Sequence, residues 1–286
     1  MNQSKTILIT GASTGIGYGC VKEFHRRGYH VFGSVRKPAD AERLQSEMPD
    51  RFTPLLFDVA NPEAIQEAVQ TVAQFLGEGQ GLGGLINNAG VAIGGPLMLQ
   101  SMEEIRQHFE VNVFGMIQVT KAFLPLLGAK PNHPVAPGKI MNISSVGGKI
   151  AAPFIGAYAS TKHAVEGLSE SWRRELLLYG IDVIIIGPGA VKTPIWDKGI
   201  NVDKYKETPY GESSTNFANY ARGESEKGLT LEFTGKRIAN IFEKRKPKVR
   251  YAIVPQRMTN WTIPRLLPKR LIDRVIGKQT GLIKKK

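Results

Sequence analysis

The stretch Thr10-Gly11-Ala12-Ser13-Thr14-Gly15-Ile16-Gly17 decides the fold, because it lies between a short apolar strand and a helix. A strand, a glycine-rich turn and a helix N-terminus together present free backbone N–H groups to a pyrophosphate. Gly11 allows the tight turn, Gly15 a close approach of the backbone, and Gly17 the packing of the helix on the sheet. Glycine also marks ordinary turns, so this loop needs support from the rest of the chain.

Outward from this loop, short apolar runs alternate with longer segments of helical periodicity. Apolar strands that alternate with helices indicate a parallel sheet covered on both faces. Since parallel crossovers are right-handed almost without exception, the predicted fold class is α/β, with a single Rossmann-type doubly wound sheet. The predicted strands are 6–9, 30–35, 52–57, 82–87, 139–143 and 182–186, and the predicted helices are 16–27, 62–76, 102–127 and 158–179.

The chain is predicted to form one domain over 1–286, because no linker is long enough to divide it. The segment 192–229 is polar with scattered aromatic residues, and is predicted to pass over one edge of the sheet as a substrate loop. The segment 236–286 is a basic extension with 16 Lys or Arg and two acids. The first 235 residues hold 22 Lys or Arg and 23 acids. A nucleic-acid-binding enzyme is expected to carry basic patches through its body, so this distribution argues against nucleic acid.

Composition excludes several classes of protein. Of the 286 residues, 42% are hydrophobic and 22% are charged, which is ordinary globular usage and argues against a disordered or fibrous chain. The single Cys20 cannot form an intramolecular disulfide, which suits a reducing compartment. No apolar run approaches the roughly 18 residues of a membrane span, and the first residues lack the pattern of a signal peptide. We therefore expect a cytoplasmic protein, and the spacing of its histidines predicts no metal site.

A second signal is the pair Tyr158 and Lys162 at the start of a predicted helix. Residues i and i+4 lie on one helix face, so a phenol and an ammonium are held side by side. A nearby cation favours the phenolate, and lowering the pKa of a phenol from about 10 to about 7 takes roughly 4 kcal/mol. Taken alone, this spacing is common by chance.

Together with the glycine loop and this pair, five further motifs make the chain resemble the short-chain dehydrogenase/reductase family over about 5–193. Their order and spacing follow that family: Asp58-Val59, Asn87-Asn88-Ala89-Gly90, Asn112 in a long helix with Ser145 placed 13 residues before Tyr158, and Gly187-Pro188-Gly189 with Val191 and Thr193. Within the family, the chain is most similar to the steroid- and retinoid-type members.

The resemblance implies that Asn112, Ser145, Tyr158 and Lys162 are catalytic. Tyr158 acts as the general acid or base, Ser145 stabilises charge on the substrate oxygen, Lys162 lowers the Tyr158 pKa, and Asn112 holds a proton-relaying water. Ser144 is the alternative to Ser145. The implied cofactor contacts are Gly11, Ser13, Thr14, Gly15, Ile16, Gly17, Arg36, Asp58, Val59, Asn88, Ala89, Gly90, Tyr158, Lys162, Pro188, Gly189, Val191 and Thr193.

The cofactor is predicted from the end of the second strand. NAD-binding sites place an acidic residue there to accept from the ribose 2′-OH. This chain has Arg36-Lys37, with no acid until Asp40, and members of the family that use NADP carry an arginine at the position of Arg36. An arginine fork suits a 2′-phosphate. NADP(H) is therefore the predicted cofactor, with a leaning toward reduction.

The predicted function is transfer of hydride between NADP(H) and a hydrophobic ketone, aldehyde or secondary alcohol. The alternatives are a 3-oxoacyl thioester reductase and, from another class, a non-catalytic NADP-sensing protein. Trp196 is the predicted substrate contact in the 192–229 segment, with Ile195, Tyr205, Tyr210 and Phe217 as further candidates. The resemblance also implies a homodimer or homotetramer formed through the helices 102–127 and 158–179.

The C-terminal segment has an apolar stripe at helical spacing, flanked by cations. One interpretation is that the stripe packs on the protein and that its charges are solvated. Another is peripheral contact with an anionic membrane, and a third is that Pro264 and Pro268 divide the segment into two pieces over the substrate entrance. The stripe consists of Ile263, Leu266, Leu267, Leu271, Ile272, Val275 and Ile276.

Overall fold

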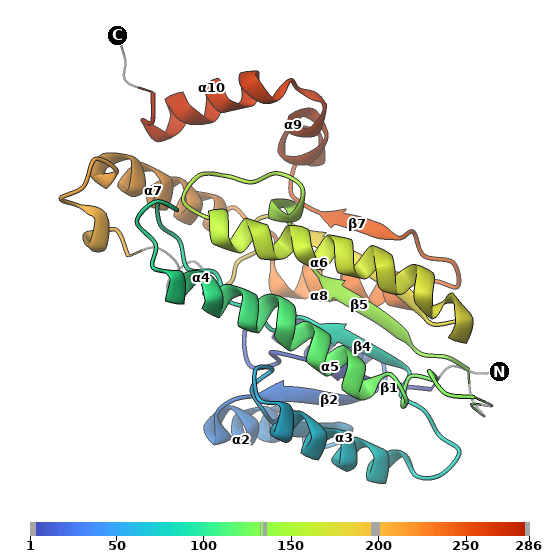
Figure 1. The fold of residues 1–286 in the computed structure, drawn as a ribbon. Helices are drawn as coiled ribbons and strands as arrows, with labels where there is room; N and C mark the ends of the chain where they lie inside the picture. Colours follow the sequence, from blue (N-terminus) through green and yellow to red (C-terminus); the bar gives the residue numbers. More distant parts are fainter. Residues whose placement is uncertain (1–3, 132, 134–135, 196–200, 284–286) are drawn as a thin grey trace.

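Seven parallel strands form one sheet in the computed structural model, which describes residues 4–131, 133, 136–195 and 201–283 (Figure 1). Their order is β3-β2-β1-β4-β5-β6-β7. The chain reverses its direction of winding between β1 and β4, which is where open α/β sheets bind their ligands. The strands are β1 Thr6–Ile9, β2 His30–Val35, β3 Phe52–Leu56, β4 Gly84–Asn87, β5 Lys139–Ile143, β6 Asp182–Pro188 and β7 Arg250–Ile253.

Side chains of successive strand residues enter two different apolar layers, because they point to opposite faces of the sheet. Ile7 and Ile9 belong to one core cluster and Leu8 to the other, and all three are fully buried. The first layer lies under α1 Gly15–Arg26, α2 Pro38–Glu47 and α8 Leu231–Phe242. The second lies under α3 Pro62–Leu76, α5 Met116–Phe123 and α6 Gly156–Glu175, which Figure 1 shows on the near face together with α4 Met102–Phe109.

The predicted α/β fold with helices on both faces is confirmed. The six predicted strands and the four predicted helices all exist, with ends that shift by up to four residues. The helix predicted over 102–127 ends at Phe123 because Pro125 has no N–H to continue it, and its middle is the π-helical segment Glu110–Gly115. Strand β7 and helices α2, α7 Gly211–Glu226 and α8 were not predicted.

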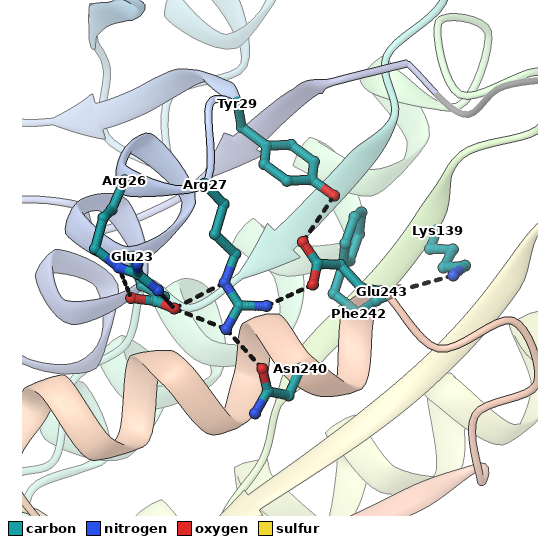
Figure 2. Close-up of polar contacts among 8 residues, drawn as sticks. All are labelled: Glu23, Arg26, Arg27, Tyr29, Lys139, Asn240, Phe242 and Glu243. Atoms are coloured by element: carbon teal, nitrogen blue, oxygen red, sulfur yellow. Dashed lines mark hydrogen bonds and ion pairs between the residues drawn. The ribbon is translucent and has the colours of Figure 1, made fainter.

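Helices α1 and α8 approach closely because glycines face each other. A Cβ on Gly235 would lie 2.3 Å from the Gly19 carbonyl oxygen, so only glycine fits there. At the C-terminal end of α1, Arg27 donates to Glu23 of the same helix at 2.7 Å. It joins α1 to α8 by donating to Asn240 at 2.6 Å and by pairing with Glu243 (Figure 2). Hydrogen bonds from Arg26 and, to a smaller extent, from Arg27 lower the pKa of buried Glu23 to about 2. The Glu23 carboxylate is therefore charged at neutral pH.

The basic C-terminal segment forms a π-helical turn Met258–Thr262, then α9 Ile263–Leu266 and α10 Lys269–Thr280. Pro268 separates α9 from α10 as predicted. Pro264, in contrast, lies in the first turn of α9 and does not interrupt that helix. In the described part of the chain, no helix is long and apolar enough to cross a membrane.

Candidate active site

The predicted site residues come together at one edge of the sheet. Parallel strands direct all their carboxyl ends to the same edge, so the loops after β1, β2, β4, β5 and β6 meet there. The glycine loop follows β1, Arg36 follows β2, Asn88 follows β4, Ser145 follows β5, and Gly189 follows β6. The fold thus places the predicted cofactor and catalytic segments side by side.

The glycine loop has the backbone that its glycines predict. Gly11 and Gly15 have φ of 65° and 59°, a left-handed conformation that favours glycine. A Cβ on Gly17 would lie 2.2 Å from the Gly11 carbonyl oxygen, which leaves no room for another residue. Among the described residues, no side chain caps the N-terminus of α1 and no acid lies in its first turn. Its N–H groups therefore suit a pyrophosphate, which is an observation that fits a dinucleotide.

The segment after β4 is hydrogen-bonded to the glycine loop. The Asn88 amide donates to the carbonyl oxygens of Thr10 and Gly11, at 2.9 and 3.1 Å. The Thr10 hydroxyl in turn accepts from the N–H groups of Asn88 and Ala89, at 2.9 and 3.0 Å. In the structure, the side chain of Asn88 thus shapes the loop in which the predicted cofactor contacts lie.

Arg36 is exposed at the end of β2, and its guanidinium lies 3.5 Å from the carboxylate of Asp58. These two predicted cofactor residues therefore form an ion pair at the surface of the protein. Arg43 was not predicted: it lies one helix turn into α2 and donates to the Ser13 carbonyl oxygen at 2.7 Å. It places a guanidinium beside the glycine loop. The sequence places Arg43 seven residues after Arg36. That spacing would have pointed to the glycine loop only if a helix over 38–47 had been predicted.

Asn112 lies in the π-helical segment, a feature that is frequent at functional sites. Its amide donates to the carbonyl oxygen of Val91 at 2.9 Å and to the hydroxyl of Thr161 at 3.0 Å, and its oxygen accepts from the Val91 N–H at 2.8 Å. Asn112 thereby joins α6 to the loop after β4. It also lines a cavity of about 10 Å³ together with Lys162. This volume is at the lower limit for one water molecule.

The two adjacent serines point in different directions. The Ser144 hydroxyl donates to the carboxylate of Glu166 at 2.8 Å, behind the site. The Ser145 hydroxyl accepts from the Gly147 N–H at 3.0 Å, and it also bonds the phenol of Tyr158. Ser145 is thus the serine on the side of the predicted general acid.

Tyr158 and Lys162 are both buried on one face of α6. Burial raises the pKa of the Tyr158 phenol, and the hydrogen bond with Ser145 opposes that rise. Burial also lowers the pKa of Lys162 to about 8. The ammonium lies 5.7 Å from the centroid of the phenol ring and donates to the Ile143 carbonyl oxygen at 2.9 Å. That Lys162 lowers the pKa of Tyr158 stays a prediction.

A buried carboxylate behind the serines was not predicted. Glu166 on α6 accepts from Arg250 of β7, and its carboxylate lies 3.3 Å from the Lys149 ammonium. Arg250 also donates to the carbonyl oxygen of Ser145 at 3.2 Å. Glu166 lies four residues after Lys162, so the two share one face of the predicted helix. This spacing could have identified Glu166 from the sequence. Arg250 lies in the strand that the sequence did not predict.

Apolar side chains pack around Tyr158. It belongs to a buried cluster with Ala92, Phe154, Ile155 and Phe217, against which Ile195 and Tyr210 pack. Phe217 comes from α7, so the 192–229 segment does reach the candidate active site. Trp196 lies outside the described residues. Tyr205 is buried, and a Cβ on Gly95 would lie 2.2 Å from its hydroxyl oxygen.

Comparison with known proteins shows the family of this chain and relates its fold to solved structures. A family model described as short chain dehydrogenase matches residues 5–201, and the chain belongs to that family. A 3-dehydrocapnine reductase from Ornithobacterium rhinotracheale is 39% identical over 273 residues, which are 95% of each chain. That relative is named as NADPH-dependent, in agreement with the cofactor that the sequence predicts here.

Two further comparisons cover nearly the whole chain. Dehydrogenase/reductase SDR family member 9 from Bos taurus is 33% identical over 297 residues, covering 96% of this chain and 88% of the relative. A solved short-chain dehydrogenase from Streptomyces avermitilis has a TM-score of 0.79 and 28% identity, covering 98% of this chain and 96% of its own. Both matches cover so much of this chain that they extend past residue 250.

Proposed function

We propose that this protein uses NADPH to reduce a hydrophobic ketone or aldehyde to an alcohol, and catalyses the reverse reaction with NADP⁺. The observation that carries the proposal is the convergence of Ser145, buried Tyr158 and buried Lys162 beside the glycine loop. NADPH, when bound, supplies the hydride to the carbonyl carbon. The protein must then stabilise negative charge on the carbonyl oxygen and provide it with a proton.

Tyr158 provides that proton. Its pKa is raised by burial, so the phenol carries its proton at neutral pH and can donate it to the substrate oxygen. The Ser145 hydroxyl donates a hydrogen bond to the same oxygen as charge develops. Lys162, with its pKa near 8, and the small cavity beside Asn112 provide the route by which Tyr158 regains a proton.

NADP(H) binding is assigned to the backbone of the glycine loop and to Arg36. The N–H groups at the start of α1 hold the pyrophosphate, and Arg36 holds the 2′-phosphate. Asp58 and Val59 contact the adenine, and the segment from Pro188 to Thr193 contacts the nicotinamide end. Thr193 supports this arrangement, because its side chain packs 3.4 Å from the position that a Cβ on Gly15 would take.

The substrate class follows from the apolar cluster on the substrate side of Tyr158. Phe154, Ile155 and Phe217 are buried beside Tyr158, and their side chains bring no polar group for recognition. The relative named as an NADPH-dependent 3-dehydrocapnine reductase supports reduction as the reaction. A hydrophobic ketone therefore fits better than a small polar carbonyl compound, because the latter would leave its own polar groups unpaired.

The test is the Tyr158→Phe variant, assayed by NADPH absorbance with ketones of graded size. Loss of the phenolic proton should lower kcat by a factor of about 10² to 10⁴. NADPH should still bind, as followed by fluorescence titration. Tyr179→Phe, at an exposed tyrosine after α6, is the matched control and should retain full activity. Retained turnover in Tyr158→Phe would refute the mechanism, and absence of turnover in the native protein with every ketone would favour a non-catalytic sensor.

We further place residues 1–286 in one functional unit that works in the cytoplasm as a homodimer or homotetramer. Exposed Met102 and Phe114 support an oligomer, because both lie on the helices that the resemblance assigns to the interface. Light scattering after gel filtration tests this directly: Phe114→Glu should reduce the measured mass to that of a monomer, and an unchanged mass would exclude this interface.

A further inference from the structure

The segment 257–283, here called the C-terminal arm, lies at the edge of the molecule beyond α6 and α7 (Figure 1). It carries six Lys or Arg residues and one acid, Asp273, which lies 3.7 Å from Arg270. The arm is therefore strongly cationic. None of the groups assigned to catalysis or to NADP(H) lies on it, so its composition needs another explanation.

The arm is anchored to the protein at both ends. Near its start, Trp261 is buried with the guanidinium of Arg250 4.3 Å from its ring centroid and that of Arg265 4.6 Å from it. Near its end, Thr280 is buried, and a Cβ on Gly281 would lie 3.2 Å from the Asn216 amide of α7. These contacts hold the arm in a fixed orientation.

With both ends anchored, the arm exposes an apolar ridge to solvent. Leu266 on α9 is 79% exposed, and Leu271 and Val275 on α10 are 44% and 55% exposed. Leu271 and Val275 are four residues apart, so they lie on one helix face, with Arg274 and Lys278 beside them. This is the pattern of a helix that lies in a membrane surface, with its apolar side chains among the acyl chains and its cations at the headgroups.

A hollow next to the ridge strengthens this interpretation. A cavity of about 1070 Å³ separates α10 from the segment 149–153. Its walls include Ile150, Pro153, Ile272 and Ile276. Its charged lining consists of the cations Lys149, Lys269, Arg270 and Arg274 and of the acid Asp273. Apolar walls with a cationic border complement an amphiphile with a negative headgroup. A protein partner would need complementary shape on this face, whereas a lipid surface needs only the charge and the apolar ridge.

We propose that the C-terminal arm docks on an anionic phospholipid bilayer, with Leu266, Leu271 and Val275 entering the interface and the neighbouring cations bound to lipid phosphates. Because α10 packs on α7, and α7 carries Phe217 of the cluster around Tyr158, docking brings the substrate side close to the lipid. The docking itself does not depend on which substrate is reduced, or on catalysis.

The experiment is sedimentation of the full chain with vesicles. One set contains phosphatidylcholine alone, and the other contains phosphatidylcholine with 30% phosphatidylglycerol. At about 20 mM salt we expect at least tenfold tighter binding to the anionic vesicles. At about 500 mM salt most of that difference should disappear, since the Debye length falls to a few ångströms. Equal binding to both vesicles, or no binding to anionic vesicles at low salt, overturns the proposal.

Two variants with matched controls assign the binding to the arm. Leu266→Ser/Val275→Ser should weaken binding at least tenfold, whereas Leu178→Ser/Leu56→Ser, at positions with the same exposed fractions of 79% and 55%, should bind like the native chain. Arg274→Gln/Lys278→Gln should weaken binding to anionic vesicles, whereas Lys22→Gln/Lys121→Gln should not. Equal loss in a variant and its control overturns the assignment.

Other occupants of the arm are distinguished in the same samples. If the leucine and valine variant changes the mass measured by light scattering while native protein ignores vesicles, the ridge is an interface between copies of this chain. If the cation variant loses binding to duplex DNA and native protein ignores vesicles, the arm is a nucleic-acid site. Either outcome overturns the proposal. Reductase activity on a water-soluble ketone, measured without vesicles, should be unchanged in both variants.

Discussion

Arg250 donates through Nε to both carboxylate oxygens of Glu166, at 3.0 and 2.9 Å. Glu166 lies in the middle of α6 and is 2% exposed, while Arg250 begins β7. The same guanidinium donates to the Ser145 carbonyl oxygen, so the ion pair connects the last strand to the serine that we propose to be catalytic. A buried pair of this kind stabilises the fold only while both partners are present.

Arg250→Met should therefore lower the free energy of unfolding by about 3 kcal/mol, near the low end for a broken buried pair, because Lys149 still neutralises Glu166. It should also lower kcat, because Ser145 loses a donor that positions its backbone, and leave the KM for NADPH unchanged. Urea denaturation and steady-state kinetics measure both effects. Arg237→Met, at an exposed arginine of α8, is the control and should change stability by less than about 0.5 kcal/mol.

The adjacent serines should separate catalysis from stability. Ser145→Ala removes a hydroxyl that bonds Tyr158, and should lower kcat by about 10² to 10³ with little change in stability. Ser144→Ala removes a hydrogen bond to buried Glu166, and should lower the free energy of unfolding by about 1.5 kcal/mol or more with a smaller effect on kcat. The reverse result would make Ser144 the catalytic serine.

Arg36→Asp should reverse the cofactor preference. The substitution replaces the donor for a 2′-phosphate with a carboxylate that repels it and can accept from a 2′-OH. We expect kcat/KM for NADPH to fall at least tenfold, and that for NADH to rise. Lys121→Asp, an exposed charge reversal on α5, is the control for the change in net charge. An unchanged ratio of the two kcat/KM values would show that Arg36 does not bind the phosphate.

The buried ammonium of Lys162 predicts a pH dependence of stability. Its pKa is about 8 in the folded protein and near 10.5 in the unfolded chain, so between these values the unfolded chain binds more protons. The contribution of Lys162 to the free energy of unfolding should therefore rise with pH from 8 toward 10.5, and be unfavourable below 8. Lys162→Met lacks this contribution.

Urea denaturation of native protein and Lys162→Met at pH 7, 8 and 9 measures the difference. The free energy of unfolding of the native protein, relative to that of the variant, should increase with pH by up to about 1.4 kcal/mol per pH unit above pH 8. Burial raises the pKa values of Tyr29 and Cys20, so their contributions to the free energy of unfolding fall as pH rises. The comparison with the variant cancels these two contributions, because both proteins contain them. A constant or falling difference would contradict a lowered Lys162 pKa.

Local sequence was sufficient for the elements that are apolar on both faces or sharply bounded. Strand β5 and helix α3 have the predicted ends, because β5 holds Ile140, Met141 and Ile143 between Gly138 and Ser144, and α3 begins at Pro62 and stops before Gly77. Strand β7 was missed because it lies at the edge of the sheet, is only half-buried over most of its length, and contains an arginine. Helices α2 and α7 were missed because most of their residues are polar and few are buried.

The sequence by itself determined the glycine loop, the order of the motifs and the spacing of Tyr158 and Lys162, because a turn, a helix face and a strand end depend on neighbours within a few residues. Only the tertiary structure decided which partner each polar group meets. Ser144 reaches Glu166, Arg250 reaches the Ser145 carbonyl oxygen, and Arg43 reaches Ser13 across separations that no local pattern encodes. Burial creates those contacts, since a charge or hydroxyl taken out of water must find its partner wherever the packing of the sheet and helices places one.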